Sequence, residues 1–254
     1  MKKVIIISKK DPASLNIKEE LDKINIKTQV IEQEPIYAES IDKKIDADFF
    51  IFATKHRSEK GVNSLSVHTP GNWNKADLGG KEKTLCTSSA LLQKIAFLKL
   101  SELAKNTNYE VTLECTHHGP FLEKPCMFIE IGSSLGQWKD KNAAQIIAKT
   151  IQHLLKDNHQ IKKQEIAIGL GGPHYSNTFN KILLRTNIAT SHICPKHMLP
   201  YLTEEILIEA IEKTQEKVDF ILSDWKGLGT EKIRIINLLK ELNLDYKKSK
   251  ELLE

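Results

Sequence analysis

The sequence predicts an α/β protein with a mainly parallel sheet that helices cover on both faces. Short apolar segments alternate with amphipathic helical segments along almost the whole chain, which is the pattern of parallel sheets. The segment 48–54 (DFFIFAT) is an almost continuous apolar run, as expected for a strand buried on both faces. Because the 254 residues show no internal repeat and no low-complexity linker, we expect a single domain over 1–254 with a long loop insertion at about 55–83.

Local signals place the individual elements. Asp11 and Pro12 supply an N-cap and a proline at the first helical position, so a helix should begin there and reach residue 24. Strands are expected at 4–8, 28–32, 48–54, 109–116, 126–132, 165–169, 188–194 and 218–223. Further helices are expected at 88–105, 139–156, 203–216 and 230–242, with a short Lys-rich helix at the end. Glycine and proline interrupt the stretch 55–83, which is expected to be a loop with at most a short strand at 64–68.

Composition excludes several classes of protein. A chain with 40% hydrophobic and 28% charged residues is neither disordered, collagen-like nor a coiled coil. No apolar run approaches the roughly 20 residues of a membrane span, and the apolar start is shorter than the roughly 7–15 residues of a secretory signal, so we expect a cytoplasmic protein. No two of the four cysteines form a CxxC motif, and we expect all four to be reduced thiols. A net charge of +4 allows binding to a polyanion without requiring it.

The histidines are concentrated at positions that suit a binding site. Seven of the nine fall in predicted loops or at strand ends: His56, His68, His117, His118, His174, His192 and His197. In an open α/β sheet the binding crevice lies beyond the carboxyl ends of the strands. Because His56, His117 and His174 closely follow three predicted strands, we expect them to converge.

The segment 111–120 (VTLECTHHGP) contains a candidate general base. Side chains of a strand alternate between its two faces, so Glu114 and His118 are predicted to share one face. A carboxylate that orients an imidazole raises its basicity, and His174 is a further catalytic candidate. The alternative interpretation is a surface Glu–His pair at the edge of the sheet.

Two other features are candidates for substrate binding. Glu130 is a lone carboxylate in an apolar strand, which suits an ammonium group, a metal or, equally well, a buried salt bridge to a lysine. The backbone N–H groups of Gly171 and Gly172 could receive a phosphate or a developing oxyanion, and Asn177 adds an amide nearby. Their loop matches neither GxGxxG nor a Walker A motif, so a nucleotide cofactor is disfavoured.

A third cluster has a spacing compatible with metal ligation: His192, Cys194 and His197. Zinc accepts both residue types, and its sites usually use three or four protein ligands. We therefore expect one or two of the cluster to join a strand-end group such as His117 or His174. The alternative is that Cys194 is a buried thiol and His197 a surface imidazole.

Taken together, these segments resemble the D-aminoacyl-tRNA deacylases of the archaeal and plant type. Six blocks match in order: 54–58 (TKHRS), 64–72 (SLSVHTPGN), 114–120 (ECTHHGP), 128–133 (FIEIGS), 169–174 (GLGGPH) and 192–197 (HICPKH). They span nearly the whole chain, so the resemblance is more specific than any single motif.

The resemblance implies hydrolysis of the ester that joins a D-amino acid to the 3′-terminal ribose of tRNA, which is chiral proofreading in translation. It also implies a fold akin to peptidyl-tRNA hydrolase and the nucleoside phosphorylases, and one or two zinc ions. Because no GxSxG elbow occurs, an activated water is favoured over an acyl-enzyme. Glu130 would then bind the α-ammonium group, and His56 and Arg57 the terminal adenosine or its phosphate. We expect a monomer with tRNA as its partner and no membrane contact.

Two alternatives come from other functional classes. A zinc peptidase or amidohydrolase would use the HxxE pair His56 and Glu59, a spacing that occurs often by chance. A tRNA-binding protein without catalysis would keep the Lys-rich surface but would have no need for histidines clustered at strand ends.

Overall fold

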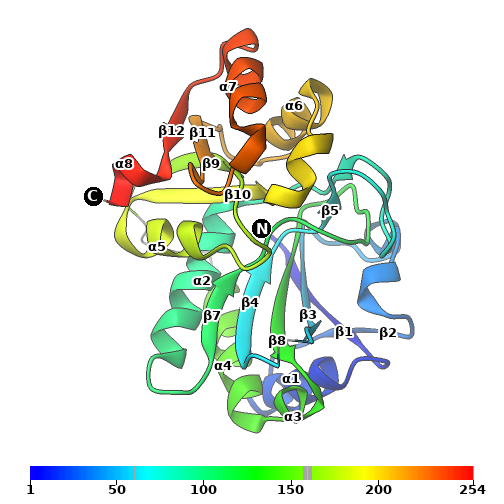
Figure 1. Ribbon diagram of the computed structural model, residues 1–254. Helices are drawn as coiled ribbons and strands as arrows, with labels where there is room; N and C mark the ends of the chain where they lie inside the picture. The colour runs from blue at the N-terminus through cyan, green and yellow to red at the C-terminus, as the bar shows by residue number, and fades with distance from the viewer. Residues whose placement is uncertain (60, 157–158, 160–161, 254) are drawn as a thin grey trace.

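The computed structural model describes residues 1–59, 61–156, 159 and 162–253, and it has the predicted α/β architecture. Figure 1 shows a larger sheet below a smaller one. The larger sheet contains β1 (Lys3–Ser8), β2 (Gln29–Ile31), β3 (Phe49–Arg57), β4 (Ser64–His68), β7 (Glu110–Leu113) and β8 (Cys126–Ser133). The smaller sheet contains β9 (Glu165–Leu170), β10 (Ile188–Cys194), β11 (Phe220–Ser223) and β12 (Tyr246–Lys248). A separate pair is formed by β5 (Gly71–Asn72) and β6 (Thr84–Leu85).

Both main sheets are mainly parallel, as predicted. The larger sheet has the order β2-β1-β3-β8-β4-β7, and only the β4–β8 pair in it is antiparallel. The smaller sheet has the order β10-β9-β11-β12 and is parallel throughout. The reversed direction of β4 sets its carboxyl end beside the first half of β8, where His68 lies opposite Phe128 and Ser66 opposite Glu130.

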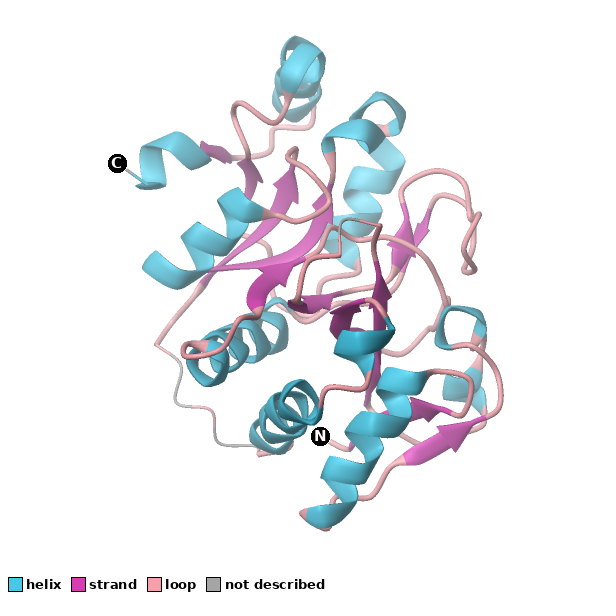
Figure 2. Ribbon diagram, turned by 60° about the horizontal axis from the view of Figure 1, so that its bottom comes forward, coloured by secondary structure: helices cyan, strands magenta, loops and turns pink. Residues whose placement is uncertain are grey.

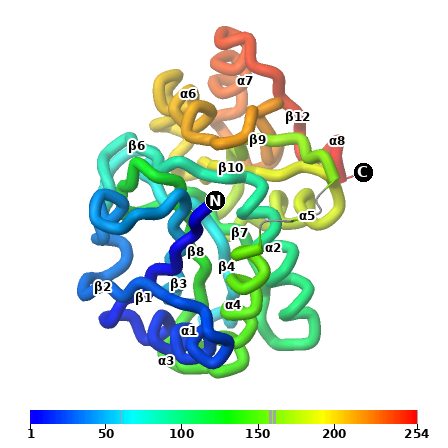
Figure 3. Tube along the Cα trace, turned by 180° about the vertical axis from the view of Figure 1, so that it is seen from behind, coloured from blue at the N-terminus to red at the C-terminus, as the bar shows by residue number. Residues whose placement is uncertain are grey.

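The helices pack against both sheets (Figure 2). They are α1 (Pro12–Lys23), α2 (Ala90–Ala104), α3 (Leu135–Trp138), α4 (Lys141–Leu154), α5 (Asn177–Arg185), α6 (Glu204–Glu212), α7 (Lys232–Glu241) and α8 (Ser249–Leu253), with 3-10 turns η1 (Pro35–Tyr37), η2 (Ile41–Lys43), η3 (Lys196–Tyr201) and η4 (Gly229–Glu231). As predicted, the Asp11 side chain caps α1 by accepting a hydrogen bond from the Ser14 backbone N–H. α1 and α4 pack on each other and on the larger sheet (Figure 3), whereas α2 contacts β4 and β7 of the larger sheet and β10 of the smaller one.

One apolar core runs across both sheets. It includes Phe49 and Met127 of the larger sheet and Ile188 and Phe220 of the smaller one. The opposite face of the larger sheet, which carries Phe50, Phe52 and Phe128, packs under the segment around η2 and under residues 86 and 122. β3 is therefore buried on both faces, as predicted, although 3-10 turns and loops rather than α-helices cover its second face.

The predicted short strand at 64–68 is β4, an internal strand of the larger sheet. The structure departs from the sequence prediction elsewhere: β3 continues to Arg57, into the expected loop, and β7 ends at Leu113 instead of residue 116. α5 is an additional helix, and the chain ends in β12 and α8 instead of one Lys-rich helix.

The four cysteines are free, buried thiols, as predicted. Within the described residues, no helix has both the length and the apolar character needed to span a membrane.

Candidate functional site

A cleft of about 940 Å³ opens beside the larger sheet. Its walls come from the ends of β3 and the middle of β8, from residues 117–118 after β7, from residues 173–177 after β9, and from η1. The expected convergence is found, since the rings of His56 and His117 lie 5.6 and 4.5 Å from the ring of His174, centroid to centroid.

The segment that follows β7 joins the two sheets and carries the central residues of the site. The Glu114 N–H donates to the carbonyl of Val67 in the larger sheet, at 3.1 Å. The Thr116 N–H donates to the carbonyl of Ile193 in the smaller sheet, at 2.9 Å. Between them, the Cys115 N–H donates to the carbonyl of His174 at 3.0 Å. These three bonds hold the segment in one position relative to both sheets.

Glu114 is the centre of a buried ionic network. Its Oε2 accepts a hydrogen bond from His174 Nε2 at 2.9 Å and lies 3.6 Å from His117 Nε2. His56 Nδ1 lies 3.0 Å from Oε1 but outside hydrogen-bond geometry, which leaves Oε1 without a hydrogen-bond partner among the described residues. Burial acts to raise the pKa of the Glu114 carboxyl, but the contacts with His174 and His56 outweigh it and hold the pKa well below its usual value.

The two imidazoles beside Glu114 favour the protonated form. Burial lowers the pKa of His56, but the carboxylates of Glu114 and Glu130 reverse this and raise it to about 11. For His174, the effect of burial is likewise exceeded by hydrogen bonds to Cys115 and Glu114, which raise its pKa to about 10. His56 Nε2 also lies within hydrogen-bond distance of the Tyr175 hydroxyl, at 3.0 Å.

Glu130 is buried in β8 at the floor of the cleft. The Thr54 hydroxyl donates to its Oε1 at 2.7 Å, while Oε2 lies 3.7 Å from Nδ1 of both His56 and His68 and has no hydrogen-bond partner among the described residues. Burial raises the pKa of this carboxyl to about 7. Of the two interpretations of the sequence, the salt bridge to a lysine is not formed among the described residues, in which the ionic contacts of Glu130 come from histidines.

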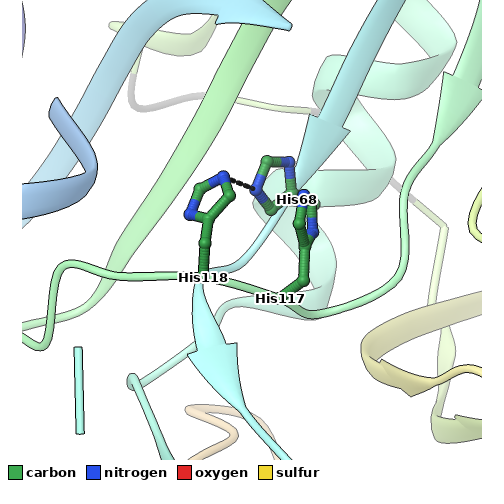
Figure 4. Close-up of side chains that lie close together, drawn as sticks. All are labelled: His68, His117 and His118. Carbon is green, nitrogen blue, oxygen red and sulfur yellow. Dashed lines mark hydrogen bonds between the residues drawn. The ribbon is translucent and has the colours of Figure 1, made fainter. Parts of the chain in front are cut away.

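His68, His117 and His118 form an imidazole cluster (Figure 4), in which His117 and His118 line the cleft and His68 is fully buried. Nε2 of His68 and Nε2 of His118 lie 3.2 Å apart, and the rings of His68 and His117 lie 4.4 Å apart, centroid to centroid. The pKa of each of these three imidazoles is lowered, mainly by burial. They are therefore neutral near pH 7 and able to act as metal ligands.

Four groups of side chains within the described residues have ligand atoms close enough to hold a metal ion. They are His68–His117–His118, Cys115–His117–His174, His56–Glu114–His174 and His68–Glu114–Glu130. In each group, the potential ligand atoms lie within 4.8 Å of one another. The groups share members, so they form one continuous set of nitrogen, oxygen and sulfur donors.

The structure does not pair His118 with Glu114. The prediction assumed that strand alternation continues to residue 118, but β7 ends at Leu113, and His118 has a left-handed backbone with φ of 46°. His118 contacts His68 instead, and Glu114 contacts His174 and His56.

The predicted metal cluster of β10 is dispersed. His192 is fully buried, with Nδ1 3.3 Å from the Thr116 hydroxyl. Cys194 packs in an apolar cluster, and η3 carries His197 into a neighbouring pocket of about 490 Å³. Of the candidate metal groups found in the described residues, none contains any of the three, whereas His117 and His174, the strand-end residues expected to join them, each belong to two.

The remaining predicted residues divide between the two pockets. Asn177 and Arg57 line the cleft, whereas Gly172 lines the neighbouring pocket. The Gly171 N–H donates to the carbonyl of Cys194 at 2.8 Å, so it is already used and cannot receive an oxyanion. Glu59 lies at the rim of the cleft, and no candidate metal group of the described chain pairs it with His56.

Sequence reasoning gave no role to Tyr175, which follows His174, and it placed His68 only among the histidines in loops or at strand ends that could complete a metal site. His68 ends β4, which the sequence marked as a short strand within a loop. The alternation of SLSVH was the available signal for His68. No local signal identified Tyr175.

Comparisons with known proteins agree on one family. A family model described as D-aminoacyl-tRNA deacylase matches residues 43–247. Proteins named D-aminoacyl-tRNA deacylase from Pyrococcus furiosus and Thermococcus onnurineus are 36% and 37% identical to this chain, covering 96% of it and 98% of each relative. The crystal structure of a conserved protein of unknown function aligns with a TM-score of 0.91 at 30% identity, covering 99% of this chain and 96% of that one.

Proposed function

The chain belongs to the D-aminoacyl-tRNA deacylase family, and on that premise we propose that it hydrolyses the ester between a D-amino acid and tRNA in the cleft lined by His56, His117 and His174, beside the buried Glu114. The observation that carries the assignment of the site is the buried Glu114 carboxylate, which has three imidazoles within 3.6 Å. A hydrolase needs groups that activate water and groups that accept developing charge, and this cleft supplies both.

The imidazole cluster fits a zinc ion. A histidine that binds zinc usually donates its other ring N–H to an oxygen, which fixes the tautomer. His117 Nδ1 lies 2.8 Å from the carbonyl of Cys115, and His118 Nδ1 lies 2.6 Å from the carbonyl of Gly119. For His68, Nδ1 lies 3.7 Å from Glu130 Oε2, beyond hydrogen-bond distance, and has no hydrogen-bond partner among the described residues. On His117 and His118, Nε2 is therefore the nitrogen available to a ligand, and His68 Nε2 lies 3.2 Å from that of His118.

We assign His68, His117 and His118 as the zinc ligands on this basis, since three histidines with an open fourth position are a known catalytic donor set. Zinc held there would supply Lewis acidity for ester hydrolysis.

Glu114 and His174 are the proposed proton-transfer residues. Glu114 Oε1, the carboxylate oxygen without a hydrogen-bond partner among the described residues, would accept the proton that water loses as it attacks the ester carbonyl. The side chain of His174 is 39% exposed in the cleft, and its Nδ1 contacts only the Cys115 thiol, at 3.4 Å, within the described structure. From Nδ1, His174 would give a proton to the ribose oxygen as the ester bond breaks. The products are the free D-amino acid and tRNA with its hydroxyl restored.

Glu130 is the proposed partner of the substrate's α-ammonium group. It lines the floor of the cleft, and its Oε2 is a buried acceptor that lacks a hydrogen-bond donor among the described residues. An ammonium group would donate a charge-assisted hydrogen bond to Oε2. This bond would hold the amino acid at a second position, in addition to its ester group.

The test is hydrolysis of D-tyrosyl-tRNA and L-tyrosyl-tRNA, with and without a chelator. We expect release of tyrosine from the D-substrate only, lost on chelation and restored by zinc. Equal release from both substrates would contradict chiral selectivity, and full activity after complete metal removal would contradict the zinc assignment.

A further inference from the structure

The cleft has an apolar wall that the chemistry proposed above does not use. Opposite the buried carboxylates, η1 contributes Pro35, Ile36 and Tyr37, and the loop before β6 contributes Leu78. Tyr37 and Leu78 are 51% and 53% exposed, and Gly79 brings them together, because a Cβ placed on Gly79 would lie 3.1 Å from the Tyr37 ring.

The fold does not require these two side chains. Neither belongs to any of the apolar clusters of the described residues. The Tyr37 hydroxyl makes no hydrogen bond within the part of the chain that the structure describes. Single exposed apolar residues are common on protein surfaces, but these two stand together on the wall of a cleft that holds reactive groups.

The wall is fixed relative to the imidazole cluster by close backbone contacts. A Cβ on Gly79 would lie 2.0 Å from the carbonyl oxygen of Ile36, and one on Gly119 would lie 2.2 Å from the Gly80 nitrogen. The Gly119 N–H donates to the carbonyl of Leu78 at 2.9 Å. Because Gly119 directly follows His118, these backbone contacts connect the exposed pair to one of the proposed zinc ligands.

The connectivity of the substrate decides which of its parts meets this wall. The amino acid is the outermost group of aminoacyl-tRNA, so it must enter deepest, where Glu130 and Phe128 are buried. The terminal adenosine follows it and must stay nearer the mouth, because the rest of the tRNA remains outside. Proteins hold unpaired bases by stacking them on aromatic side chains. Of the aromatic rings that line the cleft, Phe128 is buried and Tyr175 is half-buried beside His56, whereas Tyr37 is exposed.

We propose that Tyr37, supported by Leu78, is the platform on which the 3′-terminal adenine of the tRNA stacks during hydrolysis. This inference rests on the function proposed above and assigns a specific residue to recognition of the nucleotide.

The decisive experiment compares two esters that differ in the nucleoside: 2′(3′)-O-D-tyrosyl-adenosine and D-tyrosine methyl ester. For Tyr37→Ala, the ratio of kcat/KM for the adenosine ester to that for the methyl ester should fall roughly 5- to 150-fold, which is ~1–3 kcal/mol of stacking. Tyr37→Phe keeps the ring and should stay within about twofold of the wild type. The matched control is Tyr201→Ala, since Tyr201 is 50% exposed in η3 and is absent from the cleft lining of the described residues.

A second measurement is independent of catalysis. Calorimetric titration with adenosine monophosphate should show a similar loss of affinity in Tyr37→Ala, but not in Tyr37→Phe or Tyr201→Ala. An equal fall for both esters would overturn the proposal and assign the wall to the amino-acid side chain, and unchanged values for both would also overturn it. Failure of the wild type to cleave either ester, with nucleotide binding retained, would instead count against the proposed function.

Discussion

His68 and His118 face each other through Nε2 atoms that lie 3.2 Å apart. Nδ1 of His118 is 2.6 Å from the carbonyl of Gly119, so the proton sits on Nδ1 and Nε2 presents a lone pair. Tetrahedral ligands about 2.0–2.1 Å from zinc are separated by ~3.3 Å. The two histidines are therefore spaced as two ligands of one zinc ion would be.

We expect His68→Ala to lose zinc and activity together. Protein purified without a polyhistidine tag should contain zinc by elemental analysis, and chelation should lower its thermal stability because a bound metal stabilises the folded state. His197→Ala, which removes an imidazole outside every candidate group of the described residues, should keep both zinc and activity. A His68→Ala protein with the zinc content of the wild type would show that the ligands lie elsewhere.

Glu114→Gln should lower kcat by roughly 10²–10⁴-fold, the usual contribution of a general acid or base. The amide keeps the shape of the side chain but cannot accept the proton of the attacking water. Steady-state hydrolysis of D-tyrosyl-tRNA measures the effect, and zinc content should be retained. Glu110→Gln, an exposed change in β7, is the control. Comparable turnover in the two variants would remove Glu114 from the mechanism.

The elements that follow from local pattern could be predicted from the sequence. The apolar segment 48–54 lies almost wholly within β3, because a strand buried on both faces is marked by its composition alone. The start of α1 could also be predicted, because the Asp11 cap and Pro12 influence only the first turn of the helix, which is a local effect. The ordered blocks of family resemblance added the activity, which no single pattern specifies.

The site could be predicted only in part, because its contacts join segments that are distant in the sequence. That His56, His117 and His174 converge followed from their strand ends, but the pairing of Glu114 with His174 depends on backbone bonds between the two sheets. His68 enters the site because β4 runs antiparallel to β8, and no local pattern sets the direction of a strand.

Glu130→Gln should discriminate between substrates with and without a charged α-amino group. Loss of the carboxylate charge should lower kcat/KM for D-tyrosyl-tRNA by about 10-fold or more, because a hydrogen bond to a charged group contributes about 1.5–3 kcal/mol. The variant should affect N-acetyl-D-tyrosyl-tRNA much less, since that substrate has no ammonium group. Parallel kinetics on the two substrates provide the measurement, and an equal loss on both would exclude recognition of the ammonium group by Glu130.

Lys94 should make the stability of the protein depend on pH well away from the cleft. This lysine of α2 is 3% exposed, and its Nζ donates to Gln164 Oε1 and to the carbonyls of Thr186 and Ile188 at 2.6–2.9 Å. Burial lowers its pKa from 10.5 to about 8. Between these values the unfolded chain holds a proton that the folded chain has lost, so the free energy of unfolding rises with pH.

Lys94→Met removes this titration, and the comparison isolates it. The free energy of unfolding of the wild type minus that of Lys94→Met should be constant below about pH 7.5. Above that pH the difference should rise by at most about 1.4 kcal/mol per pH unit, because the wild type gains stability. Urea denaturation from pH 7 to 10 measures it, with Lys99→Met of the same helix as the control, since Lys99 pairs with Glu102 at the surface. A difference that is flat across this range would mean that Lys94 stays charged in the folded protein, held by its three acceptors.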